Sequence, residues 1–174
     1  MNLETLREQS ISYGADGAYL IDAGIIKTRQ WVRMKCQFGC PVYGMNYTCP
    51  PHVPEIKEIE RFFGEYRDAL ILEFRDLKKL DDQKKVAKAV LRLEHDAFLG
   101  GFHKAFGLAA GPCHLCAKCR APEGRQCKDM KNRRPSMESF CIDVYELLTD
   151  AGCTLDPVQK KTDSYKSYGL LLIR

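Results

Sequence analysis

Four cysteines lie within one short segment of this chain, and their spacing is the feature that most constrains it. Cys113, Cys116 and Cys119 are separated by two residues each, and Cys127 follows eight positions after Cys119. Three thiolates at such intervals reach three corners of a small cube of iron and sulfide, and a fourth thiolate closes the last corner. Structural zinc sites more often use two separate cysteine pairs. The spacing therefore predicts a [4Fe–4S] cluster at these four residues, with a zinc site as the alternative.

A second cysteine-rich segment lies earlier in the chain and offers three local thiols, Cys36, Cys40 and Cys49. Three thiolates cannot complete a tetrahedral metal ion or a four-iron cube. Either a distant residue completes the set, or one iron keeps an open position where a substrate or water binds. The candidates for a fourth ligand are His52, Cys141, Cys153 and His114. For Cys141 and Cys153, the competing interpretation is a thiol that is simply packed in the interior, because free cysteine is often buried.

Length and composition set the frame for these two segments. At 174 residues and 45% hydrophobic content, we expect a single domain over residues 1–174, with cluster loops at about 36–54 and 111–135. No run approaches the ~18 apolar residues of a membrane span, and the start does not resemble a signal peptide. We therefore expect a cytoplasmic protein without membrane association. In such a reducing compartment, nine cysteines indicate metal binding or catalysis more than disulfides.

The charge of the chain is consistent with anionic clusters. The formal net charge of +4 counts every cysteine as a neutral thiol. A [4Fe–4S]2+ core carries about −2 with four thiolates and about −1 with three, because coordinating thiols lose their protons. Two such clusters would bring the net charge to about +1. No long basic face with interleaved aromatic residues stands out, so we expect no nucleic-acid binding.

Hydrophobic patterns predict alternating helices and strands. Helices are expected over residues 3–13, 55–64, about 81–103 and 135–152, and strands over 18–21, 68–74 and 168–173. Residues 25–26 and 31–34 suggest a further extended segment leading into Cys36, and turn residues dominate from there to Pro54. The fold class that follows is α/β or α+β, a single compact layer of four to five strands with helices and two cysteine-rich cluster loops. Whether the two loops face each other stays open.

A basic pair precedes the last expected helix. Arg133 and Arg134 are followed by Pro135 and Ser136. Guanidinium groups beside a helix N-terminus form a corner that favours anions. The pair indicates a small anionic ligand or the docking of an acidic redox partner. Charge compensation for the neighbouring cluster is the interpretation that we prefer.

Both cysteine segments, taken with their flanks, resemble a known family. Its first motif is similar to Trp31–Gly44 and Cys49-Pro50-Pro51, and its second to Gly111–Cys119, Cys127, Arg134–Glu138 and Ile142–Val144. The family comprises small prokaryotic cysteine-rich proteins of unknown function described as predicted metal-binding. The resemblance implies metal or iron–sulfur binding at the seven motif cysteines and assigns no reaction. Cys141 and Cys153 lie outside the motifs, which weakens them as ligands.

The function that we predict from these patterns is electron transfer by two [4Fe–4S] clusters, in exchange with a redox partner protein. The main alternative is a redox enzyme whose three-cysteine cluster binds substrate at an open iron, and a zinc-stabilised interaction module is a third possibility. The spacing of Cys36 and Cys40 is similar to that of radical enzymes, but eight residues separate Cys40 from Cys49, which excludes that class. No Gly-rich dinucleotide fingerprint follows a strand, so we expect no NAD or flavin bound through a Rossmann motif.

Overall fold

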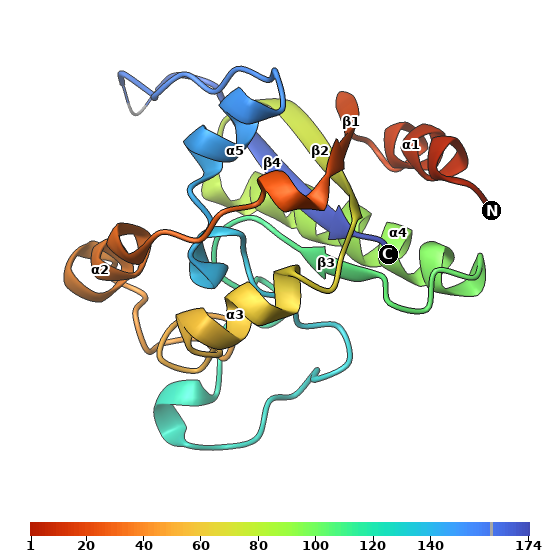
Figure 1. Ribbon diagram of the computed structural model, residues 1–174. Helices are drawn as coiled ribbons and strands as arrows, with labels where there is room; N and C mark the ends of the chain where they lie inside the picture. Colours follow the sequence, from red (N-terminus) through yellow and green to blue (C-terminus); the bar gives the residue numbers. More distant parts are fainter. Residues whose placement is uncertain (161) are drawn as a thin grey trace.

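The computed structural model describes residues 1–160 and 162–174, and within them one antiparallel sheet of four strands forms the centre. The strands are β1 (Gly17–Asp22), β2 (Asp68–Leu77), β3 (Phe106–Leu108) and β4 (Tyr165–Leu172), in the order β1-β2-β4-β3. Ile71 in the middle of β2 lies opposite Tyr19 of β1 and Leu170 of β4. The mixed α/β class expected from the sequence is confirmed, with four strands (Figure 1).

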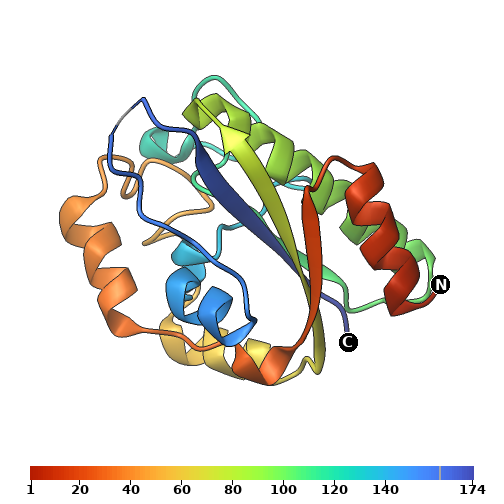
Figure 2. The same cartoon turned by 90° about the horizontal axis from the view of Figure 1, so that it is seen from above.

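The central strand β2 divides its side chains between two buried layers, because successive residues of a strand point to opposite faces. Leu70 and Leu72 belong to one apolar cluster, whereas Ala69 and Ile71 belong to the other. Both faces of the sheet are therefore covered. In Figure 2, α1 (Leu3–Ser12) and α4 (Gln83–Leu99) lie on one side of the sheet, and α3 (Ile56–Phe63) and α5 (Val144–Asp150) lie on the other.

The long helix α4 is the main cover of one face. Its buried residues recur every three or four positions, as an amphipathic helix requires: Val86, Ala89, Val90, Leu93 and Ala97. Leu6 of α1 completes this layer. On the opposite face, Ile59 of α3 and Leu147 of α5 pack against β2 and β4. Short 3-10 turns connect these elements at Ala23–Ile25, Leu80–Asp82, Ala121–Glu123 and Glu138–Phe140. Among the described residues, no helix combines the length and the apolar content that crossing a bilayer requires.

Two of the expected elements differ from the structure. The segment expected to be extended before Cys36 is a helix, α2 (Gln30–Gly39), because three apolar residues within a run of four fit either period. The expected helix over residues 135–152 is interrupted: Ser136 forms an isolated bridge with Ala109, and Cys141 has a φ of 61° in the left-handed region. The helix α5 begins only after Asp143, whose side chain accepts the N–H groups of Tyr145 and Glu146.

Glycines in β3 and β4 allow α4 to lie directly on the sheet. A Cβ atom on Gly169 would lie 2.5 Å from Cγ2 of Val90, and one on Gly107 would lie 2.4 Å from Cγ1 of the same residue. These distances are far below a normal van der Waals contact. The two glycines therefore set the spacing between helix and sheet, and with it the position of the loop that follows β3.

Gly169→Ala should destabilise the protein by about 1–3 kcal/mol, because the new methyl group overpacks the contact with Val90. Urea unfolding followed by circular dichroism measures the loss. Adding Val90→Ala should recover part of it by making room. Gly64→Ala serves as the matched control, since its Cβ would approach no atom closer than 3.4 Å. A Gly169→Ala protein as stable as the wild type would contradict this account of the packing.

Candidate metal centre

The first cysteine loop, residues 36–54, starts on the last turn of α2. Cys36 lies within the helix, and the backbone leaves helical geometry at Cys40. The loop then folds on its own main chain: the N–H of Gly44 donates to the carbonyl of Pro50 at 2.9 Å, and that of Cys49 donates to Asn46 at 3.1 Å. A stretch dominated by turn residues thus acquires a defined shape, and it brings its third cysteine back toward the helix end.

The charges of the first three thiols act on one another. Burial, followed by the charge on Cys40, raises the pKa of Cys36. Burial raises the pKa of Cys49 to about 11, with further increases from the charges of Cys40 and Cys36, while a hydrogen bond from Thr48 opposes the rise. The three cysteines of the first motif are therefore close enough for their charges to act on one another. Because metals bind thiolates, each thiol must lose a proton on ligation.

The second cysteine loop, residues 111–135, follows β3. Gly111 turns the chain with a φ of 63°, and Gly124 turns it again with a φ of 62°. Between them, a 3-10 turn closes with the N–H of Gly124 donating to the carbonyl of Ala121 at 3.0 Å. These two turns return Cys127 to the three closely spaced cysteines, with which it lines one cavity.

All four cysteines of the second loop line one small, partly open cavity of about 20 Å³. Its wall also contains three basic side chains and one acidic side chain: Lys118, Arg120, Lys128 and Asp129. Burial is the main cause that raises the pKa of Cys113, and the charges of the other three thiols raise it further. The backbone N–H of Leu115 donates to Cys113 and lowers its pKa. An N–H group pointing at a cysteine sulfur is one of the contacts by which proteins stabilise iron–sulfur clusters.

The two loops face each other, which the sequence had left open. The charge on Cys113 makes a small contribution to the raised pKa of Cys49, so the two thiols act on each other electrostatically across the loops. The hydroxyl of Tyr47 in the first loop donates to the carbonyl of Arg125 in the second at 2.8 Å. The guanidinium of Arg133 lies 5.3 Å from the ring of Tyr47. Both loops occupy the lower part of Figure 1, away from the sheet.

Two of the four candidates for a fourth ligand, Cys141 and His52, have contacts in the region of the first set. Cys141 is fully buried, its charge acts on Cys36, and its Sγ accepts a hydrogen bond from Nε of Arg33 at 3.3 Å. His52 lies within the loop, where its ring faces the carbonyl of Gly44 at 3.2 Å. Cys141 and His52 thus remain near the first set.

The other two candidates have different surroundings. The pKa of Cys153 is raised by burial and by Glu73, with Lys166 opposing, and none of the motif cysteines acts on it. His114 belongs to the second loop, and its Nε2 atom is buried without a hydrogen-bond partner among the described residues. Cys153 is therefore placed apart from the first set.

The basic pair before the expected last helix is engaged inside the molecule. Nε of Arg134 donates to Oε2 of Glu94 at 2.6 Å, and both side chains are mostly buried. Arg133 lies over Tyr47. Only a 3-10 turn, Glu138–Phe140, follows the pair. The anion corner expected at these arginines therefore lacks the helix N-terminus on which it was based.

Sequence reasoning missed Arg33 as a residue of this region. It lies three residues before Cys36 on α2, and besides Cys141 it donates to the carbonyl of Pro54 at 3.2 Å. Residues three apart share a helix face, so the contact becomes visible only when residues 30–39 are known to be helical. Arg33 thus connects the helix, the end of the first loop and the segment around Cys141.

Two observations bear on what the donors can hold. Among the described residues, no three His, Cys, Asp or Glu side chains gather closely enough for one metal ion. A tetrahedral zinc site needs its sulfurs about 3.8 Å apart, so zinc would require these side chains to draw together. A four-iron cube is larger and separates its thiolates more. In addition, a cavity of about 450 Å³ lies beside α2, and Cys36 and Cys40 form part of its wall.

Comparison with known proteins gives one family. A family model described as "Predicted metal-binding protein (DUF2284)" matches residues 19–173, a range that contains all seven motif cysteines. No curated protein and no solved structure matches the chain. The family match confirms the resemblance seen in the sequence and supports metal binding. Its description specifies neither the metal nor a reaction.

Proposed function

We propose, from the premise that this chain belongs to the DUF2284 family of predicted metal-binding proteins, that it is an electron-transfer protein with two [4Fe–4S] clusters. Cys113, Cys116, Cys119 and Cys127 would hold one cluster, and the first cysteine set would hold the other. The observation that supports this most is the single cavity lined by all four thiols of the second loop. The basic side chains in its wall suit a negatively charged core.

Electron transfer is favoured by the relation between the two sets. When bound, each cluster would accept and release one electron. The chain itself joins the two loops through the Tyr47–Arg125 hydrogen bond, and Cys49 and Cys113 act on each other electrostatically. All seven motif cysteines are only half-buried, which leaves both sites near the surface where a redox partner docks. Basic residues around the second loop suit a partner with an acidic surface.

Anaerobic purification followed by iron, sulfide and zinc analysis tests the proposal. We expect about eight iron and eight sulfide per chain, with no stoichiometric zinc, since each cubane holds four of each. After reduction, electron paramagnetic resonance should show two clusters that interact magnetically, because the two cysteine loops are in contact. A colourless protein with two zinc ions per chain and no acid-labile sulfide would overturn it.

A redox enzyme is the second candidate, and the cavity beside α2 favours it. Cys36 and Cys40 lie in its wall beside three aromatic side chains, Trp31, Tyr145 and Tyr165, and the remaining wall is aliphatic or charged. With three thiolates as ligands, one iron of the first cluster would have a position open to a substrate atom. Apolar and aromatic walls with a few charged groups are typical of sites for small organic molecules.

Cyanide, a small iron ligand, separates the two candidates. In the enzyme, cyanide should change the paramagnetic resonance signal of the first cluster and leave that of the second unchanged. In a pure electron carrier whose fourth ligand comes from the protein, neither signal should change. Cys141→Ala and His52→Ala identify such a ligand, because removing it would open the iron and make the signal respond to cyanide.

A further inference from the structure

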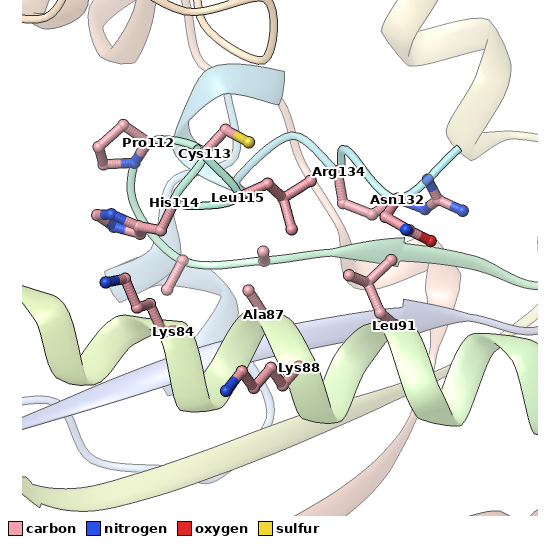
Figure 3. A pocket seen from close by; sticks show the side chains of 12 residues that line it. Lys84, Ala87, Lys88, Leu91, Pro112, Cys113, His114, Leu115, Asn132 and Arg134 are labelled. Atoms are coloured by element: carbon pink, nitrogen blue, oxygen red, sulfur yellow. The ribbon is translucent and has the colours of Figure 1, made fainter. Parts of the chain in front are cut away.

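A cavity of about 190 Å³ lies between α4 and the second cysteine loop, and the electron-transfer function does not use it. Its walls are mostly apolar: Ala87, Leu91, Ala109, Ala110, Pro112 and Leu115. Figure 3 shows Ala87 and Leu91 on α4 and Leu115 on the loop above them, facing the same space. Apolar walls with a few polar groups are typical of sites for small molecules. The cavity therefore suits a ligand with a small apolar body.

Polar side chains stand at both ends of this cavity. Lys84 and His114 lie at one end in Figure 3, and Asn132 and Arg134 lie at the other. Three of the lining side chains, Lys84, Lys88 and Arg134, are cationic, and none of the lining residues is an aspartate or glutamate. Such a wall favours a ligand with negative charge.

The two cations at the ends are not equivalent. Arg134 is held by Glu94 in an ion pair that is largely shielded from water, so its charge is already compensated. Lys84 pairs with Asp81, but 43% of the Lys84 side chain and 69% of the Asp81 side chain are exposed, and exposed pairs are weak. The Lys84 end is therefore where an incoming anion gains most.

His114 is an independent reason to place the anionic group of the ligand at the Lys84 end of the cavity. Its Nε2 atom has no hydrogen-bond partner among the described residues, although the atom is shielded from solvent. Buried polar atoms are nearly always paired, so an unpaired one indicates a missing partner. A neutral imidazole nitrogen that carries hydrogen donates one bond, and a carboxylate oxygen accepts it.

We propose that this cavity binds a small monocarboxylic acid, with its carboxylate against Lys84 and His114 and its apolar body between Leu91 and Leu115. This inference rests on the proposed function in one respect: the group beside the cavity is taken to be the second iron–sulfur cluster. Cys113 lines both this cavity and the cavity shared by the four thiols of the second loop. An acid bound here therefore alters the surroundings of the second cluster.

Calorimetric titration of anaerobically purified protein tests the inference with three acids: benzoate, phenylacetate and hexanoate. At least one should bind, and acetate and the alcohol with the same body should bind at least about tenfold more weakly, because they lack the body or the charge. The bound acid should also shift the paramagnetic resonance signal of the second cluster. Binding of none of the three acids more tightly than acetate would overturn the proposal.

Two variants and one control locate the site. Lys84→Gln should weaken acid binding about tenfold, whereas Lys85→Gln, on the same helix but outside the cavity wall, should not change it. Ala87→Leu fills the cavity and should abolish binding with iron content and absorption spectrum unchanged. Full binding by Ala87→Leu would contradict the proposed location. If the protein binds the acid but contains zinc, only the proposal of two iron–sulfur clusters fails. If it contains two intact clusters but binds no acid, only the proposal of an acid-binding cavity fails.

Discussion

Cys116→Ser is expected to remove one cluster completely and leave the other in place. The four thiols of the second loop share one cavity, and the loss of one leaves a cube with an exposed, labile iron. Iron and sulfide should both fall from about eight to about four per chain. The paramagnetic resonance signal of the remaining cluster should no longer show magnetic coupling to a second cluster. Elemental analysis and spectroscopy on protein purified without oxygen measure both effects.

Cys153→Ser is the matched control for this loss. The thiol of Cys153 is half-buried, like those of the motif cysteines, but its neighbours are Glu73 and Lys166. Replacing it should leave iron, sulfide and both signals unchanged. Full iron content in Cys116→Ser, or an equal loss in Cys153→Ser, would show that the second loop is not a cluster site.

The second large effect concerns a buried carboxylate in β2. Only 3% of the Glu73 side chain is exposed. It accepts hydrogen bonds from the hydroxyls of Tyr19 and Tyr168 at 2.8 and 3.1 Å and pairs with Arg75 and Lys166 at 2.8 and 3.2 Å. Burial by itself raises the pKa of Glu73, but these contacts outweigh it and lower the pKa from 4.5 to about 2. The folded state therefore strongly favours the ionised form.

Glu73→Gln should reduce the free energy of unfolding by about 3 kcal/mol at pH 7, since a pKa lowered by about two and a half units corresponds to that amount. The sign follows from the lowered pKa: the stabilisation is complete above the ordinary value of 4.5 and is lost as the pH falls toward 2. The stability gap between wild type and variant should therefore be constant from pH 7 to 5 and shrink below 4.5.

Urea unfolding measures this gap at pH 7, and a pH series on metal-free protein follows it into acid, where iron–sulfur clusters decompose. Glu8→Gln provides the control, because Glu8 is exposed on α1 and the change should be nearly neutral. A gap below 1 kcal/mol at pH 7, or one that widens as the pH falls, would contradict the role assigned to Glu73.

The elements that the sequence predicted well are those with long, regular patterns. The buried strand near residue 70 and the amphipathic helix containing Val90 were both found where their periodicity placed them. The helix α2 was missed because its apolar residues Trp31, Val32 and Met34 stand so close together that they fit a helix and a strand equally well. The break at Cys141 was missed because a positive φ is normally announced by glycine.

The candidate site shows a similar division. Spacing along the chain sufficed to group Cys113 with Cys116 and Cys119, because ligands on one loop are local in sequence. The contact between the two cysteine loops depends instead on the Tyr47–Arg125 hydrogen bond. Such contacts join residues more than 60 positions apart and have no local pattern that reports them.

None of the seven motif cysteines belongs to either apolar cluster that packs the sheet between its helices. The hydrophobic interior is therefore complete without any thiol ligand, in contrast to zinc fingers, which are unfolded until metal arrives. If the chain holds the proposed clusters, we expect it to fold before they are inserted, because its apolar layers do not depend on them. The metal-free chain is then expected to stay folded, so that a cluster lost to oxygen could be replaced on the same protein molecule.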